Sequence, residues 1–384
     1  MGARRRRGEG SIRQRPNGLW EGTLTIPGAS PGTQRRRAVY GRSLTEVRAK
    51  LQALQQQLAE GMEPPDQRLT VAGWCSAWVE QVVERLRPST LTRYRQLVAQ
   101  QIIPTWGRVR LAQLTPSGVE RGLRQLTDGG LSPRTASHVR AVLRAALSDA
   151  QREGLLARNV ASLAKPPRVA REAPKVLTPA EARAVIDAMP DPGLQRLVAV
   201  AVNTGLRQGE LLGLRWTDVD GQAAELHVTQ ALQRVAGAYR LVEVKSISSR
   251  RTVPLTADAV AALEDQRRWQ AEARLAAGSR WRPIPGLGEL VFTTDRGQPL
   301  NGTSLTHRFE DALRAAGLPV IRWHHLRHAF AGLMLGSGSD LATVSGLLGH
   351  SSVSLTASTY AGLMPSLKRA AADRLGLLLQ RPSG

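Results

Sequence analysis

The chain has 384 residues, enough for two or three domains, and its 53 Lys and Arg against 31 Asp and Glu give a net charge of +22. Such an excess attracts a polyanion regardless of sequence, and duplex DNA or RNA is the commonest one. The single cysteine, Cys75, excludes an intrachain disulfide and a cysteine-based zinc site and favours a reducing cytoplasm. No stretch reaches the about 18 apolar residues of a membrane span and no secretory signal is present, so we expect a cytoplasmic protein with no membrane partner.

Residues 1–64 are predicted to form a small domain of three strands and one helix behind a basic, disordered tip. Asn17-Gly18 is a hairpin signal, Pro31-Gly32 marks a second turn, and Ser43 is placed to cap a helix that runs to Glu60. The alternative is a basic solubilising extension. The arginines of this domain that we expect to contact DNA are Arg13, Arg15, Arg35, Arg36 and Arg37.

Residues 65–168 are predicted to form a helical bundle. Val71, Trp74, Trp78 and Val82 recur at helical spacing and are expected in its core. Thr115-Pro116 and Ser132-Pro133 each place a capping side chain directly before a proline, which indicates a helix start. Candidates for backbone contacts, which are equally well explained as solvated charges, are Arg93, Arg95, Arg134 and Arg140.

A basic, proline-rich linker at 169–176 leads to a third domain, 177–384, which we expect to be mixed α+β, so the whole chain is predicted to be multidomain and mainly α. The stretch Thr178 to Glu181 forms a capping box at its start. The segments AELHVT, YRLVEV and SRRTVPL alternate in polarity and predict one small antiparallel sheet. Helices are expected from Leu255 to Ala276 and from Ser304 to Ala316, with a loop and a short strand between them.

The third domain also carries the side chains that suit chemistry on a phosphate. His324 and Arg327 lie one helical turn apart, and His350 and Tyr360 follow within the same short segment. Arginine clamps phosphate oxygens, imidazole can donate to them, and a tyrosine oxygen can act as a covalent nucleophile, so this set suits phosphoryl transfer without a metal. Taken singly, each histidine is more often a packed or surface residue.

A second arginine, Arg207, follows Thr204-Gly205-Leu206 at a predicted junction between two helices. Glu210 lies one turn beyond and is close enough to orient its guanidinium; a purely structural arginine satisfied by Glu210 is the alternative.

These motifs together resemble the tyrosine recombinase (phage integrase) family. The resemblance rests on TGLR-x-GEL-x-x-L-x-W-x-D-V around Arg207, on H-x-x-R, and on L-G-H followed by tyrosine. The segment ERLRPSTLTRYRQLVAQQIIPTWGRVRLAQLTP resembles the family's core-binding domain, and the first domain resembles its arm-binding domain. Two departures are Val244, where the family often has proline, and His325, where it often has aspartate beside the histidine at position 324.

The resemblance implies a mechanism. Tyr360 would attack a DNA phosphate and form a 3′-phosphotyrosyl bond, and the guanidinium groups of Arg207 and Arg327, helped by His324 and His350, would hold its non-bridging oxygens. Lys245, in the turn before SRRTVPL, would protonate the departing 5′-oxygen; by itself a lysine there is usually a solvated charge. No metal or other cofactor is required.

The resemblance also implies partners: double-stranded DNA with core and arm sites, a homotetramer that passes through a Holliday junction, and DNA-bending or directionality factors. Residues 365–379 are a candidate for a C-terminal helix that docks on a neighbouring subunit, or packs on its own. We therefore expect a site-specific integrase of a phage or mobile element, associated with the nucleoid of a bacterial host. The alternatives are a non-catalytic DNA-binding regulator and a type IB topoisomerase.

Overall fold

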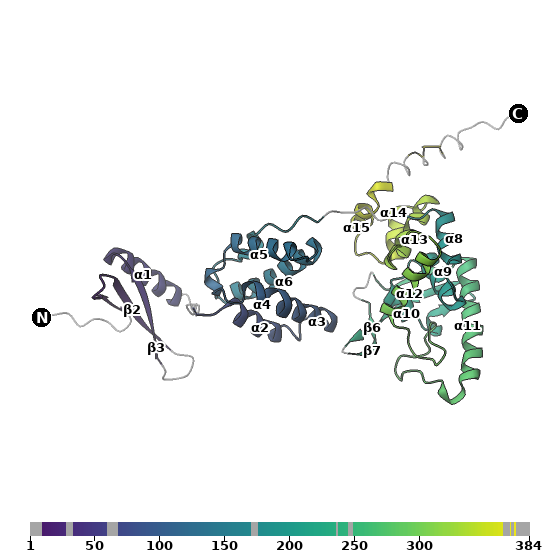
Figure 1. Ribbon diagram of the computed structural model, residues 1–384, viewed down its shortest axis with the longest axis horizontal. Coiled ribbons are helices and arrows are strands. Elements are labelled where there is room, and N and C mark those ends of the chain that lie inside the picture. The colour runs from purple at the N-terminus through teal and green to yellow at the C-terminus, as the bar shows by residue number, and fades with distance from the viewer. Residues whose placement is uncertain are drawn as a thin grey trace. The chain divides into compact units, whose positions relative to one another are not determined.

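The computed structural model is mainly helical with small sheets, which confirms the predicted fold class (Figure 1). The chain divides into two compact units, Met1–Ala170 and Arg171–Gly384. Each is described by itself, over residues 10–27, 34–59, 68–169, 176–235, 237–244, 249–363, 369 and 372–373. In these ranges no helix combines the length and apolar character that crossing a bilayer requires.

The first unit begins with a three-stranded antiparallel sheet in the order β1-β2-β3 and one helix. Leu24 of the sheet and Leu51 of the helix are buried in one apolar cluster, and Val47 of the helix is buried as well. The Ser43 hydroxyl accepts the Glu46 backbone N–H at 3.1 Å, as the cap prediction requires. The predicted turn at 31–32 lies outside the described residues. The elements are β1 (Ser11–Gln14), β2 (Trp20–Pro27), β3 (Gln34–Gly41) and α1 (Leu44–Ala59).

A helical bundle follows, and the predicted stripe from Val71 to Val82 is buried in it. The hydroxyls of Thr115 and Ser132 cap their helices as predicted. One feature of the bundle was not predicted: a π-helical turn lies between α3 and α4, where an extra residue interrupts the 3.6-residue period. The elements are α2 (Val71–Gln81), α3 (Pro88–Leu97), η1 (Val98–Ile102), α4 (Ile103–Trp106), η2 (Leu111–Gln113), α5 (Pro116–Asp128), α6 (Pro133–Arg152) and α7 (Val160–Leu163).

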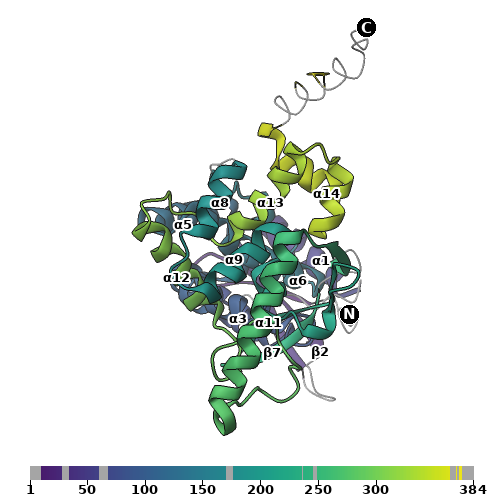
Figure 2. The same ribbon diagram turned by 90° about the vertical axis from the view of Figure 1, so that its right-hand side faces the viewer.

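The second unit is built around α9, which packs against α11 on one side and α13 on another (Figure 2). Most apolar residues of α9 are buried, among them Val198 and Ala201. The predicted capping box at Thr178 and Glu181 is present. The helices are α8 (Pro179–Asp187), α9 (Pro192–Thr204), α10 (Gln208–Leu212), η3 (Trp216–Asp218), α11 (Ala257–Ala277), η5 (Gly278–Arg280), α12 (Gly302–Ala315), α13 (His324–Gly336), α14 (Leu341–Leu348), α15 (Val353–Thr359) and η6 (Ala361–Leu363).

The strands of this unit form two sheets, so the prediction of one sheet was wrong. AELHVT and SRRTVPL do pair, as β5 and β8 of a sheet in the order β4-β5-β8. YRLVEV instead lies in β7, which pairs with the adjacent β6 as a separate hairpin, because local pairing closes a short loop. The strands are β4 (Val219–Asp220), β5 (Glu225–Val228), β6 (Gln230–Val235), β7 (Ala238–Glu243) and β8 (Arg251–Pro254).

Candidate active site

Arg207 and Arg327 meet at the junction where α9 ends and α10 begins. Gly205 caps α9 with φ of 63°, and a Cβ there would lie 2.4 Å from the ring of Phe330, so only glycine fits. The carbonyl of Gly205 accepts a hydrogen bond of 2.7 Å from Nη1 of Arg327. Arg207 follows two residues later at the start of α10. The chain reversal at Gly205 therefore places the two predicted arginines in one region of the fold.

Three successive carbonyls at the C-terminal end of α14 each accept a hydrogen bond from a different arginine. This end of a helix carries partial negative charge, which favours guanidinium groups. Gly349, with φ of 62°, turns the chain there so that its own carbonyl joins the set. The bonds run from Arg251 Nε to Leu347 O (2.6 Å), from Arg327 Nη2 to Leu348 O, and from Arg207 Nη2 to Gly349 O (3.3 Å).

Glu210 ties two of these arginines together. Its carboxylate accepts from Nη1 of Arg207 at 2.7 Å and from Nη2 of Arg251 at 2.8 Å, and it also accepts the backbone N–H of Arg207. Burial by itself would raise the pKa of Glu210, but the hydrogen bond and charge of Arg251 and the charge of Arg207 bring it below its ordinary value. Glu210 therefore stays ionised and contacts the guanidinium of Arg207, which its position one turn beyond makes possible.

The arginine cluster carries more positive than negative charge. Three guanidinium groups, Arg207, Arg251 and Arg327, face one carboxylate, Glu210, which leaves a net charge of +2 among these four described side chains. Burial, followed by repulsion from Arg207 and Arg251, lowers the pKa of Arg327 to about 9. An anion placed here would relieve that repulsion, so the cluster suits a phosphodiester.

The histidines and the tyrosine lie beside this cluster. Tyr360 is only 2% exposed, and burial raises the pKa of its phenol to about 12. Its hydroxyl lies 2.8 Å from Nδ1 of His328, whose ring is 4.9 Å from that of His324. His350 contacts the hydroxyl of Thr356 through Nδ1 at 2.8 Å, and burial, then the nearby arginines, lowers the pKa of His350 to about 4.

Five of the six predicted catalytic residues therefore lie in one region of the second unit: Arg207, His324, Arg327, His350 and Tyr360. The sixth, Lys245, lies outside the described residues. His325 occupies the position where the family often has aspartate, and its Nδ1 accepts the backbone N–H of Arg322 at 3.0 Å. The hydrogen bond of His325 is therefore to the backbone just before α13 and not to His324.

Sequence reasoning missed two residues of this region, His328 and Arg251. His328 lies four positions after His324 and so on the same helical face, which was an available signal. Arg251 shares its strand face with the buried Val253, and alternation along β8 could have placed it inside.

The arginines predicted to contact DNA lie mostly on the surface, and several already have protein partners. Arg13 and Arg15 pair with Glu21, Arg93 with Gln96, Arg95 with Glu80, and Arg140 donates to the carbonyls of Ser162 and Ala164. Arg36 and Arg134 are exposed, while the side chains of Arg35 and Arg37 lie outside the description. Of residues 365–379, the structure describes Arg369, Ala372 and Asp373 alone.

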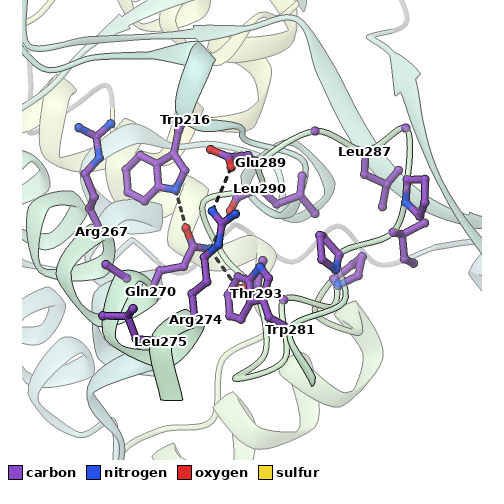
Figure 3. Close-up of a pocket in the computed structure, with 18 residues that line it drawn as sticks. Trp216, Arg267, Gln270, Arg274, Leu275, Trp281, Leu287, Glu289, Leu290 and Thr293 are labelled. Atoms are coloured by element: carbon purple, nitrogen blue, oxygen red, sulfur yellow. Dashed lines mark hydrogen bonds and ion pairs between the residues drawn. The ribbon is translucent and has the colours of Figure 1, made fainter. Parts of the chain in front are cut away.

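A pocket of about 850 Å³ lies elsewhere in the second unit, between α11 and the loop at 281–299 (Figure 3). Trp216 donates to Gln270 at 2.6 Å and lies under the guanidinium of Arg267 at 4.5 Å. None of the predicted catalytic residues is among the described residues that line it. Nor does any group of three or more His, Cys, Asp or Glu within the described ranges form a metal-binding cluster.

The sequence of this chain matches known protein families and relatives. Residues 175–365 match the phage integrase family, and residues 70–124 match the phage integrase N-terminal SAM-like domain. The chain is 29% identical over 371 residues to a "Tyrosine recombinase XerC-like" protein of Caldanaerobacter subterraneus, which covers 92% of this chain and 94% of that one. It is 31% identical over 291 residues to tyrosine recombinase XerD of Corynebacterium glutamicum, covering 71% of this chain and 88% of that one.

Two solved structures show the same fold. The Tn1549 transposon integrase in complex with transposon right end DNA aligns with a TM-score of 0.68 at 21% identity, over 80% of this chain and 100% of that one. A lambda integrase tetramer bound to a Holliday junction aligns with a TM-score of 0.56 at 20% identity, over 89% of this chain and 95% of that one.

Fold and site together define an enzyme that breaks and rejoins DNA strands. The chain belongs to the phage integrase family of tyrosine recombinases, which confirms the predicted family and enzyme class.

Proposed function

We propose that the protein is a site-specific integrase that cleaves duplex DNA with Tyr360 and integrates or excises a phage or mobile element. The observation that carries this proposal is the grouping of Arg207 and Arg327 on adjacent carbonyls at the end of α14, in the region that also holds Tyr360.

In the proposed reaction, the Tyr360 oxygen attacks the scissile phosphorus and a 3′-phosphotyrosyl bond forms as the bond to the 5′-oxygen breaks. Arg207 and Arg327 stabilise the charge on the non-bridging oxygens, and His324 and His350 donate hydrogen bonds to them. Lys245 supplies the proton to the departing 5′-oxygen. A 5′-hydroxyl from the partner DNA then reverses the step, so the bond energy is kept and no external energy source is consumed.

The partners we propose are a core site and arm sites on DNA, three further copies of the chain in a tetramer, and factors that bend DNA or set direction. The net charge of +22 supports the DNA partner, because phosphate contacts through Lys and Arg release counterions. Tetrameric assembly is proposed by likeness to the lambda integrase tetramer on a Holliday junction. We place the protein on the nucleoid of a bacterial cell.

A nicked suicide substrate tests this function. Cleavage near the nick releases a short strand and traps the covalent protein–DNA adduct, which gel electrophoresis under denaturing conditions detects. We expect an adduct with the native chain and none with Tyr360→Phe. If neither forms an adduct although both bind DNA, the protein is a regulator and the proposal fails.

A deletion of residues 1–64 tests the arm-binding domain. Core-site cleavage should persist while binding to arm-site DNA weakens, because the basic sheet and helix are removed and the bundle is kept. Equal loss of cleavage and arm binding would contradict the proposed division of labour.

A further inference from the structure

His328 is the hydrogen-bond partner of the Tyr360 hydroxyl among the residues that the structure describes. The two atoms are 2.8 Å apart, and the rings meet edge to face with centroids 5.7 Å apart. The phenol is enclosed by the apolar cluster that includes Phe330 and Leu348, so water has little access to its oxygen. None of the roles proposed above for the six catalytic residues accounts for this contact.

The nucleophile needs a proton acceptor, because a neutral phenol must lose its proton as its oxygen bonds to phosphorus. The guanidinium groups of Arg207 and Arg327 have no acceptor capacity. A neutral imidazole has one nitrogen with a free lone pair, and the nitrogen nearest the phenol is Nδ1 of His328. The required tautomer carries its hydrogen on Nε2.

The surroundings keep His328 neutral before DNA binds. Burial, then the charges of His324, His325, Arg327 and His350, lowers the pKa of His328 to about 4. The phenol, with its pKa raised to about 12, therefore keeps its proton in the free protein. A phosphodiester beside Arg327 would offset the positive charge that disfavours protonation of His328 and would make the imidazole more basic when the substrate is in place.

We propose that His328 positions the Tyr360 hydroxyl and accepts its proton during attack on the scissile phosphate. This inference rests on the proposed function of Tyr360. In the step, the bond from the Tyr360 oxygen to phosphorus forms, the bond from phosphorus to the 5′-oxygen breaks, and the phenolic proton moves to Nδ1 of His328. The leaving 5′-oxygen takes a proton from a separate acid, Lys245 in the proposed mechanism. When the phosphotyrosyl bond is reversed, the imidazolium returns its proton to the phenolic oxygen.

The test uses the full chain and two suicide substrates that differ in one atom. One has the natural oxygen at the 5′-bridging position of the scissile phosphate, and the other has sulfur there. Sulfur leaves without being protonated, so this substrate repairs a defect in the acid but not a defect in the activation of the nucleophile. Single-turnover adduct formation is measured at saturating protein, and DNA affinity and the thermal midpoint are measured for every variant.

The informative substitution is His328→Asn. Its amide oxygen can occupy nearly the place of Nδ1 and accept the phenolic hydrogen bond, but an amide cannot take the proton. His328→Ala removes both abilities and leaves space for added imidazole. The matched control is His307→Asn on the exposed side of α12. Lys245→Ala is included for comparison, because it removes the proposed general acid rather than the proton acceptor.

We expect His328→Asn to slow adduct formation by about 10²-fold or more on both substrates, since general bases contribute about 10²- to 10⁴-fold. His307→Asn should form the adduct at the rate of the native chain. The sulfur substrate should restore the rate of Lys245→Ala, and added imidazole should partly restore the rate of His328→Ala.

Native rates in His328→Asn, or repair of its defect by sulfur, would overturn the proton-acceptor role. The proton-acceptor role would also be overturned if His328→Asn formed the adduct at a normal rate while His328→Ala did not. The hydrogen bond would then serve only to position Tyr360. If His328→Asn fails to fold, the test becomes whether added imidazole raises the rate of adduct formation by His328→Ala. No increase in that rate would overturn the inference. Failure of the native chain to form an adduct at Tyr360 would instead reject the proposed function.

Discussion

Arg251 and Glu210 form a buried ion pair, with Nη2 of the arginine 2.8 Å from the carboxylate and side chains that are 5% and 3% exposed. The same carboxylate holds Arg207, so a residue of β8 controls the orientation of an arginine at the start of α10. Arg251 also binds the carbonyl of Leu347, which links β8 to the end of α14. Through Arg251, the sheet therefore supports the arginine cluster.

Replacing Arg251 with methionine should be strongly destabilising. Removing one partner of a buried pair leaves the other charge unpaired, so we expect the free energy of unfolding to fall by about 3 kcal/mol. The matched control is Arg250→Met, because Arg250 pairs with Glu243 on the surface, where both side chains are more than half exposed. That change should cost less than about 1 kcal/mol. Urea unfolding of both variants measures the difference, and equal costs would contradict the prediction.

Replacing Gly205 with alanine should disturb both arginines. The new Cβ would collide with Phe330 and force a left-handed backbone on a residue that avoids it, so we expect a loss of about 1–3 kcal/mol in unfolding free energy. Cleavage should fall as well, because the Gly205 carbonyl holds Arg327. Gly221→Ala is the control, since its Cβ would enter open space. Similar thermal midpoints for the two variants would show that the junction tolerates a side chain.

Replacing Arg207 with alanine should affect chemistry more than binding. One of the two guanidinium groups that we propose to contact the phosphate disappears, so we expect adduct formation on the suicide substrate to fall by about 10²-fold or more. Affinity for DNA should change little, because many other cations contribute to it. Arg268→Ala, on the exposed face of α11, is the control with the same charge change. If Arg207→Ala loses affinity for DNA but the bound protein still forms the adduct at the native rate, Arg207 is not part of the active site.

Acid should destabilise the second unit before its carboxylates are protonated. His328 and His350 have pKa values near 4 in the folded chain, against an ordinary value of 6.5. Between these values the unfolded chain binds more protons at these two histidines than the folded chain does. Their contribution to stability is therefore constant above pH 6.5 and is lost as the pH drops from 6.5 to 4. Thermal midpoints across this range measure the effect.

Substitution of both histidines by asparagine should flatten that pH dependence, whereas substitution of the exposed His307 should leave it unchanged. An equally steep decline in the double variant would mean that other groups cause it.

The sequence alone determined the family, the fold class and the identity of the candidate catalytic residues. These depend on short-range features: helix periodicity at Val71 to Val82, capping at Thr115 and Thr178, and motifs such as H-x-x-R in which neighbours in the chain share a helix face. The roles of Arg207, Lys245, His324, Arg327, His350 and Tyr360 remain predictions until they are measured.

Tertiary structure alone decided which groups touch. Arg207 reaches the carbonyl of Gly349 across 142 positions of sequence, and Arg251 reaches Glu210 across 41. The pairing of β7 with β6 and the contact of His328 with Tyr360 were likewise absent from the sequence patterns. Propensities and periodicities describe how a segment folds and which of its faces is buried, whereas hydrogen-bond partners are set by the packing of distant segments around a common core.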